Sequence, residues 1–219
     1  MIIKSLKNNI STLEDIRDEL CHFNRKFPLE AVQAALARQQ EMTPILMGLL
    51  SEAALSYDYL HKDYSGHIYA CYLLAYLREK HAFPLVLQIA SLPEDGPDIL
   101  LGDTITEDFH RIIGSVYDGN IQLLQQLIEN EQAYIWSRKA ALRALVVLIK
   151  AKQLERSWVM DYFKKLLSHP SFTEDEMALT HLITVAVDLY PEELYEEIKS
   201  VFANNKIDTL YSKWDIFYL

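Results

Sequence analysis

The sequence predicts an all-α fold in which pairs of helices stack into an α-solenoid, and three observations carry this prediction. Half of the 219 residues are hydrophobic, but only 6 are Gly and 7 are Pro, fewer turn-forming residues than an all-β chain usually needs. Apolar residues recur at helical spacing in most segments. Sequence signals that start helices also recur at regular intervals along the chain, which is the mark of a helical-repeat protein.

The helix starts can be followed from the N-terminus. The sequence from Ser11 to Glu14 is a capping box that opens an N-terminal helix. Pro28 fits the first turn of a helix that runs to about Gln40, and Thr43 followed by Pro44 predicts the start of the next one. The later segments expected to be helical are residues 67–80, 84–92, 104–117, 121–128, 135–149, 157–167, 174–190 and 191–203.

These helices group into pairs. The first helix of each pair is expected to begin near Leu29, His67, Ile105, Ile135 and Glu174, and the second near Pro44, Pro84, Ile121, Trp158 and Pro191. The starts of the second helices are 40, 37, 37 and 33 residues apart. Such periods are typical of two-helix repeats of the HEAT kind, which bury their apolar faces by stacking. We therefore expect residues 1–219 to form one domain, a HEAT-like α-solenoid of about five helix pairs plus an N-terminal helix.

Three segments interrupt this pattern and are expected to be loops or ends: Ser56–Gly66, Pro93–Asp103 and the aromatic-rich tail 207–219. Long loops of repeat proteins often gather on one face and carry binding function. Three alternatives are open for the tail. It folds back to cap the last repeat, it docks on a partner, or it continues into a longer chain.

The protein is expected to be soluble and cytoplasmic. The N-terminus lacks a signal-peptide pattern, and the longest apolar runs, such as Ala144–Ile149, are too short to span a bilayer. The two cysteines, Cys21 and Cys71, lie in apolar stretches and are interpreted as buried free thiols, with one disulfide between them as the alternative. Secretion that does not depend on a signal peptide is also left open.

The charge is unevenly distributed. The net charge is −10, which argues against general binding of nucleic acid. Residues 138–165, however, hold eight Lys or Arg and only two Asp or Glu, and they lie between two acidic parts of the chain. Two interpretations follow: adjacent helices pair these charges or leave them solvated, or this basic band is a docking face for an acidic partner. The candidate binding residues are Trp136, Arg138, Arg143, Arg156 and Trp158.

The second candidate region is the acidic segment 98–110. It contains Gly102–Asp108, with the sequence GDTITED, in which Thr104 and Glu107 fit a helix cap and Glu107 and Asp108 complement the helix dipole. The functional alternative is a metal or ligand site formed by the carboxylates. The candidate residues are Asp103, Glu107, Asp108 and His110.

The same segments carry a family likeness. The runs LLAYLREKHAFPLVLQIASLP, LLGDTITEDFHRIIGSVYDGN and RKAALRALVVLI resemble domain-of-unknown-function family 1186, and the likeness extends from about Leu13 to Asn205. This resemblance implies helical repeats and a bacterial origin, and it implies no activity. Some members carry a C-terminal Cys/His zinc motif of the SEC-C type. This chain has no cysteine after Cys71, so that motif is absent from it.

The functional expectation is a non-enzymatic module that binds a protein partner. The sequence has no HExxH, CxxC pair, GxSxG elbow or Gly-rich phosphate loop, so we predict no catalytic residue, metal ligand or cofactor. One alternative is a metal- or small-ligand-binding protein or enzyme centred on residues 98–110. A second is nucleic-acid binding through the band 138–165, where Trp136 and Trp158 lie among basic residues, although the acidic net charge makes nucleic acid an unfavourable partner.

Overall fold

The structure, a computed structural model, describes residues 12–60 and 63–203, and it is all-α within these ranges. The only β-pairing there is one antiparallel bridge between His22 and Tyr64. No helix of the described part is long and apolar enough to cross a membrane. The α-helices are α1 (Leu13–Cys21), α2 (Leu29–Ala37), α3 (Gln39–Ser56), α4 (Gly66–Leu77), α5 (Phe83–Ala90), α6 (Gly96–Leu101), α7 (Thr104–Glu107), α8 (Phe109–Val116), α9 (Ile121–Glu129), α10 (Ile135–Lys150), α11 (Arg156–Leu166), α12 (Pro170–Thr173), α13 (Glu176–Val187) and α14 (Tyr195–Ala203).

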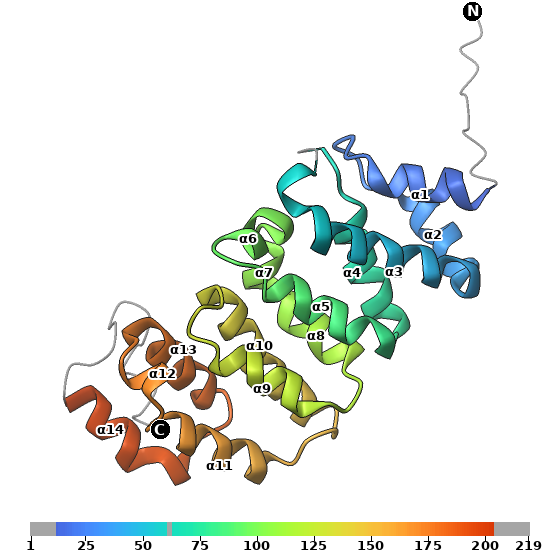
Figure 1. The fold of residues 1–219 in the computed structure, drawn as a ribbon. Coiled ribbons are helices and arrows are strands. Elements are labelled where there is room, and N and C mark those ends of the chain that lie inside the picture. The colour runs from blue at the N-terminus through green and yellow to red at the C-terminus, as the bar shows by residue number, and fades with distance from the viewer. Residues whose placement is uncertain (1–11, 61–62, 204–219) are drawn as a thin grey trace, which may run out of the picture.

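The longer helices form two rows that run side by side from the N-terminal to the C-terminal end (Figure 1). In one row α4 packs on α8, α8 on α10, and α10 on α13. In the other row α3 packs on α5 and α5 on α9, and α11 and α14 continue it (Figure 1). Each row buries its apolar side against the other, as stacked helix pairs must. This arrangement is compatible with the expected α-solenoid.

Local sequence explains where several helices begin. Thr12 caps α1, because its hydroxyl accepts a hydrogen bond from the Asp15 amide while the Asp15 carboxylate accepts one from the Thr12 amide, both at 3.0 Å. A capping box is therefore present, but it is formed by Thr12 and Asp15 and begins one residue later than the box predicted from Ser11 to Glu14. Asp175 caps α13 by accepting a hydrogen bond from the Ala178 amide.

The prediction that Pro44 starts a helix was wrong. Pro44 lies inside α3, which begins at Gln39, directly after α2. Pro44 is the sixth residue of α3, beyond the first four residues whose amides have no partner within the helix, so its missing N–H leaves the Gln40 carbonyl without a donor from position 44. The preceding Thr43 hydroxyl donates to the Gln39 carbonyl at 2.8 Å, so part of the acceptor capacity in this turn is satisfied by a side chain.

The prediction of a loop from Pro93 to Asp103 was also wrong. This segment contains α6, whose Leu100 and Leu101 are buried, and it ends at Gly102 with a φ of 49°. The expected Thr104–Glu107 cap does not form either. The chain enters α7 directly from α6, and the amide of Glu107 is bonded to the Asp103 carbonyl rather than to a capping side chain.

Contacts between neighbouring helix pairs recur at a nearly constant separation along the chain. The His67 ring contacts the Leu100 carbonyl, Tyr162 donates to Glu129, and Arg138 donates to Asp175, at separations of 33, 33 and 37 residues. A Cβ atom added at Gly114 would lie 2.6 Å from a methyl carbon of Val147, so only glycine fits where α8 crosses α10. These separations lie within the spacing expected from the sequence.

The two cysteines are free and buried, in line with the interpretation from sequence. Burial raises the pKa of both thiols, and that of Cys71 rises to about 12. The aromatic-rich tail 207–219 lies outside the described residues, so the alternatives proposed for it are not addressed by the structure.

Candidate functional site

One side of α10 carries a stripe of exposed or half-exposed side chains over its whole length. Trp136, Lys139, Arg143, Val147 and Lys150 follow one another at intervals of three or four residues, so they lie on one side of the helix. The remaining positions of α10 are mostly small or aliphatic and are buried in the core. The stripe is therefore the part of α10 that a ligand can reach.

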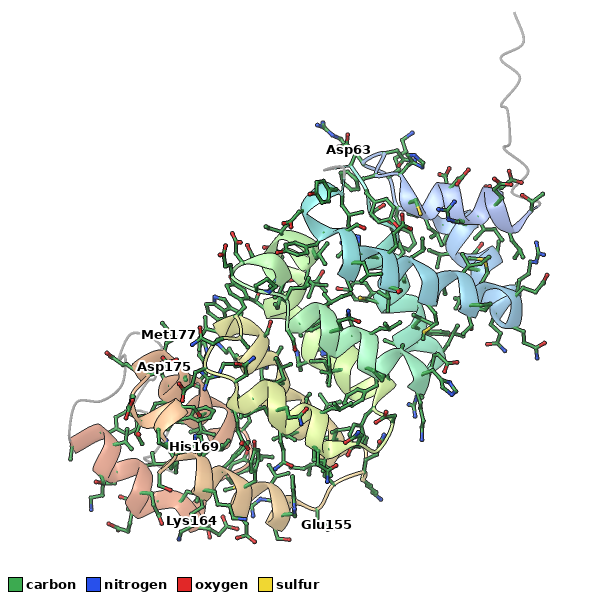
Figure 2. The ribbon with its side chains drawn as sticks, viewed as in Figure 1. Asp63, Glu155, Lys164, His169, Asp175 and Met177 are labelled. Atoms are coloured by element: carbon green, nitrogen blue, oxygen red, sulfur yellow. The ribbon has the colours of Figure 1, made fainter. Side chains whose placement is uncertain are left out.

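The neighbouring helices of the same row carry matching stripes. We call their common outward side the α4–α13 face. It is formed by Tyr69, Tyr72 and Tyr76 of α4, Asp108 and Arg111 at α8, the stripe of α10, and Met177, Thr184 and Asp188 at α13. Asp175 and Met177 lie together at the start of α13 (Figure 2). Glu155 lies at the start of α11 and Lys164 near its end, in the other row (Figure 2).

Side-chain contacts connect these stripes across the helices. The Tyr72 hydroxyl of α4 donates to the Asp108 carboxylate at 3.2 Å, and Arg111 forms an ion pair with the same carboxylate. Arg143 of α10 reaches α7, where it donates to the Thr106 carbonyl at 3.2 Å. The face is thus one connected surface.

The centre of this face carries positive charges that lack acidic partners in the described part of the chain. Arg143 bonds only to a backbone carbonyl, and neither Lys139 nor Lys150 takes part in an ion pair there. The Lys139 ammonium lies 4.8 Å from the centre of the Trp136 ring, a favourable cation–π contact. Partial burial, and then the charge of Arg143, lower the pKa of Lys139. The negative charge of a bound anion would oppose both effects and raise the pKa of Lys139 again.

Two buried histidines flank this positive region. His181 of α13 is 1 % exposed, and its ring centre lies 4.9 Å from that of Trp136. Among the described residues neither of its ring nitrogens has a hydrogen-bond partner, and Nδ1 of His110 on α8 has none there either. Burial, followed by nearby cations, lowers the pKa of both imidazoles to about 4; the main cation is Arg143 for His110 and Lys139 for His181. Both are therefore neutral at pH 7 and add no charge to the face.

The predicted site residue Arg138 lies elsewhere. Its side chain is 2 % exposed and donates to the carbonyls of Ile128 and Ser171 and to the carboxylate of Asp175, at 3.0, 2.7 and 3.1 Å. The guanidinium also lies over the ring of Phe172. Arg138 joins α9, α12 and α13 and is not accessible to a partner.

Arg156 and Trp158 are on α11, in the other row. Arg156 pairs with Glu193 and donates to the carbonyls of Leu189 and Tyr190, so it fastens α11 to the end of α13. Trp158 is 37 % exposed and stacks on Tyr162. The basic band predicted from the sequence is thus divided between contacts within the fold and the α4–α13 face.

The acidic candidates do not converge. Asp103 and Glu107 are exposed, and Asp108 is held by Arg111 and Tyr72. Tyr134 donates a hydrogen bond to Asp98, which lies on α6. In the ranges that the structure covers, no three His, Cys, Asp or Glu side chains are grouped so as to hold a metal ion.

Sequence reasoning missed several residues of the face, namely Tyr72, Tyr76, Lys139 and Lys150, and the buried His181 beside it. The spacing of residues 136, 139, 143 and 150 in the sequence was the available signal, because it repeats the period of a helix. Which stripe of α10 is exposed was not visible, since α10 is rich in apolar residues around most of its circumference.

The sequence model of the family described as "Protein of unknown function (DUF1186)" matches residues 11–215. A protein of Chlamydia trachomatis is 35 % identical over 201 residues, which covers 91 % of this chain and 80 % of the relative. A protein of Chlamydia muridarum is 35 % identical over 198 residues, covering 90 % and 79 %. Both are named only as uncharacterized proteins. No solved structure matches the chain.

Proposed function

The chain belongs to the DUF1186 family, and from that premise we propose that it is a protein-interaction module whose α4–α13 face binds a protein partner. The observation that carries this proposal is the set of α10 cations that form no ion pair among the described residues, on the same side of the row as the exposed tyrosines of α4. Two neighbouring cations without a carboxylate between them repel each other, and a bound anion would offset that cost.

The composition of the face supports a protein as its ligand. Exposed aromatic residues and arginine are the residue types that are enriched in protein–protein interfaces, and lysine stems add apolar contact area. Tyr72 and Tyr76 are 39 and 74 % exposed, and Trp136 and Arg143 lie on the same face. The row formed by α3, α5, α9, α11 and α14, which we call the second row, lacks this combination between α5 and α9. A shallow cavity there is lined by neutral side chains such as Gln88, Gln126 and Asn130.

Site-specific photocrosslinking tests the proposal. A photoreactive phenylalanine analogue is placed at Tyr76 on the face or at Gln88 in the second row, and each protein is irradiated in lysate of its native organism. We expect a defined crosslinked protein from position 76 and not from position 88.

The matched variants make the result specific. Crosslinking from position 76 is expected to be lost in Lys139→Glu/Arg143→Glu and kept in Lys80→Glu/Lys165→Glu. The second pair changes the net charge equally at exposed lysines off the face that form no ion pair in the described part of the chain. Equal crosslinking from both positions, or none from position 76, would contradict the proposal.

A further inference from the structure

The α4–α13 face has two chemically different halves. At its N-terminal end α4 presents Tyr69, Tyr72 and Tyr76, and Phe27, which is 66 % exposed, lies with its ring centre 6.3 Å from that of Tyr69. This half is aromatic and uncharged. The other half, on α8 and α10, is cationic, and its only acidic side chain, Asp108, is already paired with Arg111.

The positive half is preorganised for carboxylates. Arg143 is held by the Thr106 carbonyl and Lys139 by the Trp136 ring, so both cations are positioned before any ligand binds. Preorganised cations in a partly buried site attract an anion more strongly than solvated surface lysines do, because less water must be displaced and less side-chain entropy is lost. Glu107 is exposed and follows Thr106 directly in the sequence, but it forms no ion pair with Arg143 or Lys139.

Building on the proposed function, we propose that the partner contributes an extended acidic segment that crosses α4, α8 and α10. Its carboxylates bind Lys139 and Arg143, and an apolar side chain farther along the same segment packs on Tyr72 and Tyr76. An extended chain fits better than a single pocket-filling group, because the tyrosines of α4 and the unpaired cations of α10 lie on two helices with α8 between them.

The spacing of the two anchors follows from helix packing. Neighbouring packed helices lie 8–10 Å apart, so α4 and α10, with α8 between them, are about 18 Å apart. An extended chain advances about 3.3 Å per residue. The apolar anchor is therefore expected about six residues from the acidic residues of the partner.

Synthetic peptides test this spacing directly. The probe is a fluorescein-labelled peptide with a run of Glu separated from two Phe by about six Gly and Ser residues, and binding is measured by fluorescence anisotropy. We expect saturable binding to the full-length protein. Affinity should fall at least about tenfold when Gln replaces Glu in the peptide or when Lys139 and Arg143 are replaced by Glu.

The aromatic half is tested separately. Tyr76→Ser should weaken the Phe-containing peptide by about three- to tenfold without affecting a peptide in which Ser replaces Phe. Leu55→Ser, a change of an exposed apolar residue on α3, should affect neither peptide. A peptide with the spacer shortened to about two residues should bind like the Phe-free peptide.

Three outcomes would overturn this inference. The first is equal affinity for the Glu and Gln peptides. The second is a Tyr76→Ser variant that weakens binding of the Phe-containing peptide and of the Phe-free peptide equally. The third is a single-stranded oligonucleotide that binds more tightly than the peptide and no longer binds when Lys139 and Arg143 are replaced by Glu. If position 76 still crosslinks to a protein, any of these results rejects the acidic segment but not the proposed binding of a protein partner. If position 76 gives no crosslink, the acidic segment and the proposed function are both rejected.

Discussion

Arg138 and Arg143 lie five residues apart on α10 and have opposite roles. Arg138 is buried among α9, α12 and α13, where two carbonyl oxygens and the Asp175 carboxylate accept its side-chain hydrogen bonds. Arg143 lies on the α4–α13 face, with one backbone carbonyl as its acceptor. Five residues correspond to a rotation of about 140° around a helix, which is enough to move a side chain from the core to the surface. Position around the helix, and not charge, decides which arginine is available for binding.

The same division holds for the rest of the basic band. Arg156 and Lys164 of α11 pair with Glu193 and Glu197, whereas Lys139 and Lys150 of α10 form no ion pair in the part of the chain that the structure describes. The first group joins successive helix pairs, and we propose that the second binds the partner. Variants in the two groups should therefore differ in what they change, stability or binding.

The largest effect is expected at Arg138. Arg138→Met keeps the length of the side chain but leaves the carbonyls of Ile128 and Ser171 and the Asp175 carboxylate without their donor. Because two buried carbonyls lose their donor and Asp175, which is 40 % exposed, loses its ion-pair partner, we expect the free energy of unfolding to fall by about 3 kcal/mol. Urea denaturation followed by circular dichroism measures this change.

Arg143→Met is the control for that measurement. Its side chain is half-exposed and leaves only the Thr106 carbonyl unpaired, so we expect a change below about 0.5 kcal/mol. Equal losses in the two variants would remove the distinction between the two groups of cations.

The next effect concerns pH and the histidine beneath the face. The pKa of His181 is lowered to about 4 in the folded protein by burial and by Lys139, so the unfolded chain binds a proton there between pH 6.5 and 4 and the folded protein does not. The contribution of the neutral His181 to the free energy of unfolding is therefore fully present above pH 6.5 and is lost as the pH is lowered toward 4. For His181 alone we expect a loss of about 2 to 3 kcal/mol at pH 4.5.

Urea denaturation at pH 7 and pH 4.5 measures this loss. In His181→Leu the difference between the two pH values should be smaller than in the wild type. Lys139→Met should raise the pKa of His181, which NMR titration of the imidazole detects. An unchanged pKa would show that the face and the buried histidine are not electrostatically coupled.

Among the residues that join helix pairs, the smallest effect on stability is expected at Arg156. It is half-exposed, so the loss in Arg156→Gln should be below about 1 kcal/mol after solvent screening. Arg156 lowers the pKa of Glu193 to about 2, so this ion pair contributes stability above pH 4.5 and loses it as the pH falls toward 2. Thermal unfolding of wild type and variant should accordingly converge in acid. A difference that persists at low pH would assign the effect to the Leu189 and Tyr190 carbonyls instead.

Much of the fold was predictable because it depends on local sequence. The all-α class, the presence of a capping box near the start of α1 and the burial of both cysteines follow from apolar periodicity and from residues that start helices. The start of α3 and the existence of α6 were mispredicted. At both places proline indicates a helix start or a loop, but packing extends helix on either side of Pro44 and orders the segment around Pro97.

The candidate site was predictable only in part. The concentration of positive charge in residues 138–165 and the presence of Trp136 and Arg143 within it were visible in the sequence. Their separation from Arg138 and Arg156 was not, because it depends on acceptors about 33 to 37 residues away that only the stacking of helix pairs brings close. The sequence by itself determined which charges the chain carries and that its helices stack. The tertiary structure decided which of those charges are neutralised within the fold and which remain exposed on the α4–α13 face, because pairing requires proximity in space and not in sequence.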